Sequence, residues 1–195
     1  GGAIFSYSSS SLISNCRFLG NTANQNGGGI DCYNASPAVV NCVFSGNDAD
    51  EGGGMSCRIS STPTIQNCTF AGNTATAGGA LSFASNSDPS MINSILWGNT
   101  GGGYPQIYRP SGNDLTISYS AIQGCGGSGD DWVSTLGIDG GGNLDENPYF
   151  ADADGVDDTA GTADDDLHLN AFSACVNAGD PGGSYDEQTD LDLVS

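Results

Sequence analysis

The sequence predicts an all-β fold, a right-handed parallel β-helix of about five coils that ends in an irregular acidic C-terminal cap. Three observations lead to this prediction. The chain of 195 residues contains 31 glycines, about twice the usual share. A seven-residue motif recurs at a constant step of 26 residues. Within each copy, apolar positions alternate with variable ones, as they do in strands that bury one face.

The repeated motif reads Asn-Cys-Arg-Phe-Leu-Gly-Asn at residues 15–21. It returns with substitutions at 41–47, 67–73 and 93–99, and more weakly at 119–124. A second motif, Gly-Gly-Ala-Ile or a close variant, keeps nearly the same step. A unit of this length without a helix cannot bury its own apolar face, so the repeats are expected to stack as a solenoid.

Aligning the copies gives columns of similar residues that we expect to form ladders. Parallel strands of neighbouring coils would lie about 4.8 Å apart, with right-handed connections. Asparagine tolerates the left-handed backbone of bends, and glycine pairs suit tight corners. A leucine-rich repeat is the rival solenoid, but leucine is sparse in these columns. One predicted core column is Phe18, Phe44, Phe70, Leu96 and Ile122.

The Gly-Gly-Ala-Ile and Phe-x-x-Asn motifs resemble the repeats of chlamydial polymorphic outer membrane proteins. They resemble still more closely the right-handed β-helix repeat proteins secreted by environmental bacteria. The resemblance implies a bacterial-type extracellular or cell-surface protein, in which a β-helix is often one part of a longer chain. Segments similar to the last coils of that family are 93–99, 117–123, 145–150, 166–169, 173–175 and 178–181.

Charge divides the chain into two expected regions, β-helix repeats over 1–125 and an acidic capping region over 126–195 that holds the last coil and Asp-rich loops. Eighteen of the 23 acidic residues follow Asn113, and no lysine or arginine follows Arg109. A formal net charge of −20 with three cations argues against binding nucleic acid or an anionic membrane surface. No apolar run approaches the roughly 20 residues of a membrane-spanning helix, so we expect no membrane insertion.

The acidic region is a candidate calcium site. Alternating aspartates around a glycine can supply several hard oxygens to one Ca²⁺ ion. The alternative is a solvated acidic loop. A weaker acidic cluster lies at 186–192. The candidate ligands of a structural Ca²⁺ are Asp152, Asp154 and Asp157, completed by Asp164 or Asp166.

Seven cysteines raise the question of disulfides. Free cysteine behaves as a small buried hydrophobe, so we interpret the in-column cysteines as thiol stacks. Those stacks would be Cys16, Cys42 and Cys68 in one column, and Cys32 and Cys57 in another. Outside the ladders, Cys125 and Cys175 are candidates for a disulfide.

Catalysis has little support in the sequence. Asp31, Tyr33 and Arg58 are expected to be neighbours on the outward face of the Gly-Gly strands, as a candidate glycan patch. A glycoside hydrolase needs two carboxylates about 5–10 Å apart, and the patch has one. A lyase needs a cation and a base, and the chain has no lysine. His168, the single histidine, is expected to point outward.

Outward apolar columns beside the asparagine bend suggest that something covers them. The cover is either the chain's own C-terminal segment or a partner or neighbouring subunit. The candidate interface residues are Val40, Val43, Ile92, Ile95 and Trp97.

These observations favour a secreted or cell-surface structural protein without catalytic function, as an adhesin, spacer or filament subunit. The alternative is a polysaccharide-binding or polysaccharide-degrading protein, a lyase or hydrolase.

Residues 1–4 fall in the middle of a repeating motif, so we expect a processed chain or a fragment. An open coil end could stack head to tail into a homo-oligomer or filament, or join the remainder of a larger surface protein.

Overall fold

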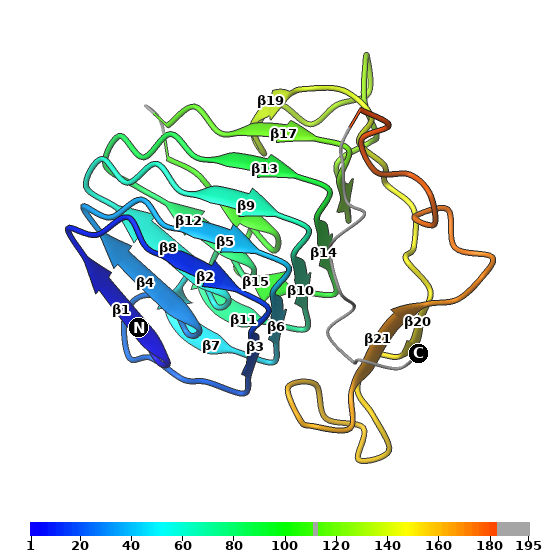
Figure 1. The fold of residues 1–195 in the computed structure, drawn as a ribbon, viewed down its shortest axis with the longest axis horizontal. Helices are drawn as coiled ribbons and strands as arrows, with labels where there is room; N and C mark the ends of the chain where they lie inside the picture. Colours follow the sequence, from blue (N-terminus) through cyan, green and yellow to red (C-terminus); the bar gives the residue numbers. More distant parts are fainter. Residues whose placement is uncertain (111–112, 183–195) are drawn as a thin grey trace.

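The computed structural model describes residues 1–110 and 113–182, and this part of the chain is a β-solenoid without helices (Figure 1). Four parallel sheets run along the solenoid, and an antiparallel pair of strands lies beside it. The predicted parallel β-helix, with coils spaced by 26 residues, is confirmed. Among the described residues, no helix is long and apolar enough to cross a membrane.

Each coil contributes one short strand to each of three long sheets. The first sheet contains β1 (Ile4–Tyr7), β4 (Ile30–Tyr33), β8 (Met55–Arg58), β12 (Leu81–Phe83) and β16 (Ile107–Tyr108). The second contains β2 (Leu12–Ser14), β5 (Ala38–Val40), β9 (Thr64–Gln66), β13 (Ser90–Ile92), β17 (Thr116–Ser118) and β19 (Ile138–Asp139). The third contains β3 (Arg17–Leu19), β6 (Val43–Ser45), β10 (Thr69–Ala71), β14 (Ile95–Trp97) and β18 (Ala121–Ile122).

The remaining strands form two smaller sheets. A three-stranded parallel sheet contains β7 (Asp48–Glu51), β11 (Thr74–Ala77) and β15 (Thr100–Gly101). The antiparallel pair is β20 (Phe150–Asp152) and β21 (Asp166–Leu169).

The core is built from stacked columns of similar residues, as the alignment of the repeats predicts. Phe18, Phe44 and Phe70 pair in register, and their rings stack with centroids 4.6 and 4.4 Å apart. Gly54 makes room for this column, because a Cβ there would lie 2.7 Å from the ring of Phe70. Stacked burial along the solenoid axis gives a continuous apolar core that no single coil could form.

The two asparagines of the motif have different roles. Asn41 adopts a left-handed backbone with φ of 53° at the bend between β5 and β6. Asn73 is fully buried; its side-chain amide donates to the Phe44 carbonyl at 2.9 Å and to Asn99 Oδ1 at 2.9 Å. Asn47 donates in turn to Asn73 Oδ1 at 2.8 Å, so a polar ladder runs through the interior.

The regular stacking continues into the region 126–195, where the sequence places a last coil. Strand β19 pairs with β17, and Leu144 forms a bridge with Ala121. Trp132 and Leu136 pack against the apolar core from this region. The next segment, residues 146–182, does not lie over the coil end. It folds back beside the sheet that contains β14 and β10, and we call it the C-terminal strap (Figure 1).

Candidate functional site

The candidate glycan patch lies on the outer face of the first sheet. Tyr33 of β4 is the register partner of Arg58 of β8, and Asp31 is the partner of Ser56. Successive residues of a strand point to opposite faces, so Asp31 and Tyr33 share the outward face while Cys32 enters the core. The structure thus brings together the three residues that ladder geometry predicts as neighbours.

Arg58 and Asp31 form a two-point ion pair. The Nε and Nη2 atoms of Arg58 donate to the two carboxylate oxygens of Asp31 at 3.2 and 2.8 Å. Asp31 is only 4% exposed, whereas the Arg58 side chain retains 28% exposure. A fork-to-carboxylate contact of this kind holds both groups in one orientation. The carboxylate is therefore occupied by a structural partner.

Aromatic rings extend the patch toward the first coil. The Tyr33 ring lies 5.3 Å from the guanidinium carbon of Arg58, within range for a cation–π contact. Tyr7 stacks on Tyr33 with ring centroids 5.6 Å apart and planes 14° apart. Phe5 follows at 6.4 Å from Tyr7, and both of these rings are more than half exposed. The result is an accessible row of rings that ends at a charged pair.

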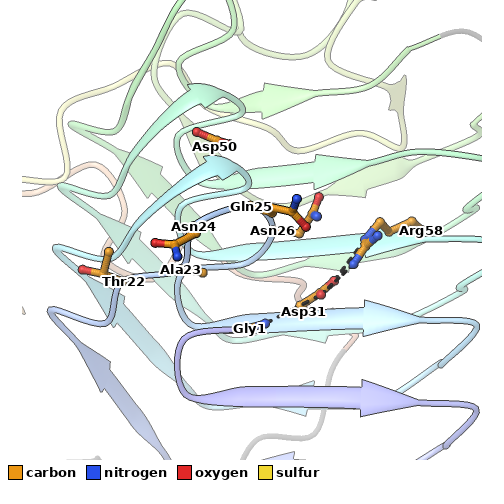
Figure 2. Close-up of a pocket in the computed structure, with 9 residues that line it drawn as sticks. All are labelled: Gly1, Thr22, Ala23, Asn24, Gln25, Asn26, Asp31, Asp50 and Arg58. Atoms are coloured by element: carbon orange, nitrogen blue, oxygen red, sulfur yellow. Dashed lines mark hydrogen bonds and ion pairs between the residues drawn. The ribbon is translucent and has the colours of Figure 1, made fainter.

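A polar hollow of about 680 Å³ adjoins the ion pair. Figure 2 shows Asp31 and Arg58 on one side of the hollow, and Asn24 and Thr22 on the other. The segment 22–26 supplies most of the lining, with amide and hydroxyl groups, and Asp50 adds a carboxylate. These groups can donate hydrogen bonds to a polar ligand and accept them from it.

The chain has three arginines, no lysine and one histidine, His168, as its basic side chains. Each arginine makes structural contacts. Arg58 binds Asp31, as described above. Arg17 donates to the Asp165 carbonyl at 3.3 Å. Arg109 donates to the carbonyl oxygens of Asn113 and Ser134. These contacts tie the coils to one another and to the C-terminal strap.

The candidate calcium ligands are not assembled into a shell. Asp152, Asp154, Asp157 and Asp164 are exposed on the strap, and Asp166 is half-buried. The described residues contain no group of three or more His, Cys, Asp or Glu side chains placed to hold a metal ion. As placed, these residues do not fit a calcium site. The weaker cluster predicted at 186–192 lies outside the described residues.

Local hydrogen bonds occupy two of those carboxylates instead. The Thr162 hydroxyl donates to Asp164 at 2.6 Å and lowers the pKa of that carboxyl. The backbone amide of His168 donates to Asp166 at 3.0 Å, with the His168 ring at 2.6 Å, and together they lower the pKa of Asp166. Both carboxyls therefore remain charged within the loop, as in the solvated alternative.

The residue that matters most on the strap, Asp165, was not among the predicted sites. It is 6% exposed, and its Oδ2 accepts hydrogen bonds from the Ser45 hydroxyl and the Gly161 amide, each at 2.7 Å. Its neighbours in the acidic run gave no reason to single it out. The signal lay in β6, where Ser45 replaces the apolar residue that other copies carry at the same position, such as Leu19 and Ala71.

Cys125 and Cys175 do not form the predicted disulfide, since both are free thiols. Cys125 belongs to the core cluster, and its thiol donates to the Leu144 carbonyl at 3.3 Å. Cys175 belongs to the strap and lines a 180 Å³ cavity together with Ile95 and Tyr119 on the outside of the coils. Cys125 thus lies in the core and Cys175 on the strap.

The predicted apolar interface is covered in part by the chain itself. Ile95 shares the 180 Å³ cavity with Leu169, Cys175 and Ala178 of the strap. Next to it, the Asp180 amide donates to Asn93 Oδ1 at 2.8 Å. These contacts correspond to the folding-back alternative. The other predicted interface residues, Val40, Val43, Ile92 and Trp97, are half-buried.

A known sequence family, described as the right-handed β-helix region, matches residues 1–131. The chain belongs to the right-handed β-helix family. No characterised relative and no solved structure is similar enough to be matched to the chain. The right-handed β-helix match covers most of the stacked coils and ends just before Trp132, while β19 and the C-terminal strap lie beyond it.

Proposed function

We propose that this right-handed β-helix protein is a secreted or cell-surface structural protein without catalytic function. Its role would be that of an adhesin, a spacer or a filament subunit of bacterial type. The observation that carries the proposal is the engagement of all three arginines in structural contacts. A polysaccharide lyase needs a cation to stabilise the developing enolate and a base to take the proton. No arginine is left to do either without breaking the scaffold.

The experiment is a paired measurement on the intact chain. Incubation with uronate polymers and neutral polysaccharides, followed by detection of unsaturated or reducing ends, should give no product above the heat-denatured control. Electron microscopy of the same preparation tests the structural role, and head-to-tail particles or filaments are the expected result for a filament subunit. Reproducible product formation that follows the folded protein through purification would overturn the non-catalytic assignment.

A second candidate function is polysaccharide binding at the glycan patch. It rests on the row of Phe5, Tyr7 and Tyr33, which ends at the Arg58–Asp31 pair beside the polar hollow. Apolar faces combined with a few fixed polar groups are the usual lining of a small-ligand site. A glycan array with the unmodified chain tests this candidate. Binding that is lost in Tyr7→Ala and retained in Tyr104→Ala, another exposed tyrosine, would support the patch.

A further inference from the structure

The 180 Å³ cavity between the C-terminal strap and the third sheet has walls from two separate parts of the chain. One wall belongs to the fourth and fifth coils and the other to the strap. The main apolar and aromatic lining residues are Ile95, Tyr119, Ala121, Leu169, Cys175 and Ala178. The cavity is partly open to solvent, so a small molecule can enter it while the strap stays in place. Such a molecule contacts both walls at once.

The polar groups around the cavity are already engaged within the protein. Ser94 and Ser120 line it, but their hydroxyls donate to the carbonyls two residues earlier at 2.9 and 2.8 Å. The Oδ1 atom of Asn93 accepts the Asp180 amide at 2.8 Å. Among the described residues, none with a charged side chain lines the cavity. The lining therefore favours an uncharged, largely apolar ligand over a charged one.

Tyr119 departs from the pattern of its column. It adopts a left-handed backbone with φ of 47°, which is unfavourable for a bulky side chain. The four earlier bends of this column have the same backbone but carry asparagine, which tolerates it: Asn15, Asn41, Asn67 and Asn93. Gly142 makes room for the ring, because a Cβ there would lie 2.4 Å from it. Strained residues of this kind cluster at functional sites, and here the strained residue places an aromatic ring in the cavity wall.

The volume of the cavity suits a ligand with one aromatic ring. An apolar cavity of about 150 Å³ in a protein interior can bind benzene. The 180 Å³ available here is slightly larger. A ligand that fills this space gains dispersion contacts that the walls otherwise lack, and its ring can pack against the ring of Tyr119.

We propose that the cavity between the strap and the third sheet is a binding site for a small uncharged aromatic molecule of about the size of benzene. Tyr119 supplies the aromatic wall of the site. The cavity lies on the third sheet and the glycan patch on the first, so the site goes beyond the proposed function and does not depend on it. Because the ligand contacts both the coils and the strap, its binding stabilises the docked strap.

Two half-buried thiols provide a reporter and an internal control. Cys175 lines the cavity, so a bound ligand shields its sulfur from an alkylating reagent. Cys16 lies outside the cavity and should react at the same rate with and without the ligand. Digestion before aspartate separates the two, since Cys16 lies in fragment 1–30 and Cys175 in fragment 166–179.

The sequence offers matched variants that fill the cavity. Ala121 is the register partner of Ile95, so Ala121→Ile adds a side chain that the same column already holds. Ala178→Val fills the cavity from the strap, and the test therefore does not depend on the folding of one variant. Ala38→Ile is the control, because Ala38 precedes the inward Val39 on the second sheet and lies outside the cavity.

The experiment alkylates the folded full chain in buffer with and without benzene and quantifies the two fragments by mass spectrometry. Benzene should slow the alkylation of Cys175 and leave that of Cys16 unchanged. It should also raise the Tm and slow the hydrogen exchange of residues 146–182. Benzoate, which carries a charge on the same ring, should produce none of these effects.

The variants locate the bound benzene. Protection of the Cys175 thiol should be lost in Ala121→Ile and in Ala178→Val, and kept in Ala38→Ile. Tyr119→Asn restores the residue of the earlier bends, so it should fold. It should weaken the apparent affinity for benzene by about tenfold, through loss of the ring contact.

Four results would overturn the proposal. Benzene may not leave Cys175 unprotected, nor slow Cys16 and Cys175 equally, since the latter result would indicate an effect of the solvent on the reagent. Equal protection by benzoate would contradict the uncharged class of ligand. Protection that persists in both cavity-filling variants would place the bound benzene elsewhere. Undiminished affinity in Tyr119→Asn would contradict the role of that ring.

Discussion

Ser45 and Asp165 are 120 residues apart in sequence, yet the Ser45 hydroxyl donates a 2.7 Å hydrogen bond to the Asp165 carboxylate. Ser45 is fully buried and Asp165 is 6% exposed. This contact ties the C-terminal strap to the second coil. The strap therefore functions as a side cover, and its attachment depends on a few polar contacts in place of an extended β-ladder.

Replacing Asp165 by alanine should loosen the strap. The substitution leaves the buried Ser45 hydroxyl without its acceptor, which costs about 1–3 kcal/mol of unfolding free energy. Hydrogen exchange of residues 146–182 should speed up more than that of the coils. The matched control is Asp154→Ala, an exposed carboxylate of the strap, measured in EDTA so that metal binding plays no part. Equal effects of the two variants would contradict an anchoring role for Asp165.

A methyl group at Gly46 should push the strap away from the coils. Its Cβ would lie 2.1 Å from the Ala160 carbonyl oxygen. Gly98 occupies the same column with a similar left-handed φ of 66°, but its Cβ would meet nothing closer than 3.9 Å. Gly46→Ala should therefore lower the unfolding free energy by about 1–3 kcal/mol more than Gly98→Ala, from steric overlap alone. Urea titrations of both variants measure the difference; equal losses would show that the strap does not press on Gly46.

The two motif asparagines should respond differently to glycine. Asn67→Gly keeps the left-handed bend, where φ is 53°, because glycine adopts that conformation freely. Asn73→Gly removes buried hydrogen bonds to Phe44 and Asn99, at a cost of about 1–3 kcal/mol for each group left unsatisfied. Thermal unfolding should show a much lower Tm for Asn73→Gly than for Asn67→Gly. A lower Tm for Asn67→Gly than for Asn73→Gly would mean that the asparagine at the bend contributes more to stability than the buried asparagine ladder.

Asp139 should stabilise the C-terminal coil in a pH-dependent way. Burial alone would raise its pKa, but hydrogen bonds from the Gly129 and Gly141 amides, Ser128 and Asn143 outweigh burial and lower the pKa to about 2. A carboxyl with a depressed folded pKa adds stability above its unfolded pKa of about 3.9. That contribution is lost as the pH falls through about 2.

The variant Asp139→Asn tests this linkage. Its Tm should be below that of the unmodified chain at pH 7, and the difference should shrink as the pH falls from about 4 to about 2. Asp130→Asn, an exposed neighbour, serves as the control and should show a small difference throughout. If the Tm difference between Asp139→Asn and the unmodified chain were the same at every pH, the proposed link between Asp139 ionisation and stability would be contradicted.

Calcium binding by the acidic strap remains a prediction from the sequence. If Asp152, Asp154 and Asp157 bind Ca²⁺ in solution, EDTA should lower the Tm and added Ca²⁺ should restore it, while Mg²⁺ should not. The double variant Asp154→Asn with Asp157→Asn should abolish the response. An EDTA-insensitive Tm would leave these aspartates as solvated charges.

Among the site residues, the sequence placed the members of the candidate glycan patch together but did not identify the anchor of the strap. Asp31, Tyr33 and Arg58 could be placed together because a parallel ladder fixes which residues are neighbours once the period is known. Asp165 could not be found this way, since it lies outside the repeats, although its partner Ser45 lies in the second copy. The predicted link between Cys125 and Cys175 is wrong for the same reason, because Cys125 belongs to the core and Cys175 to the strap, which lies outside the repeats.

The sequence by itself determined the solenoid, its 26-residue register, the stacked core and the bends, because each follows from local pattern repeated in a strict period. The tertiary structure alone decided where residues 146–182 lie and which of the consecutive acids is buried. Those outcomes depend on packing between segments with no shared period. A repeat specifies contacts only between residues one coil apart.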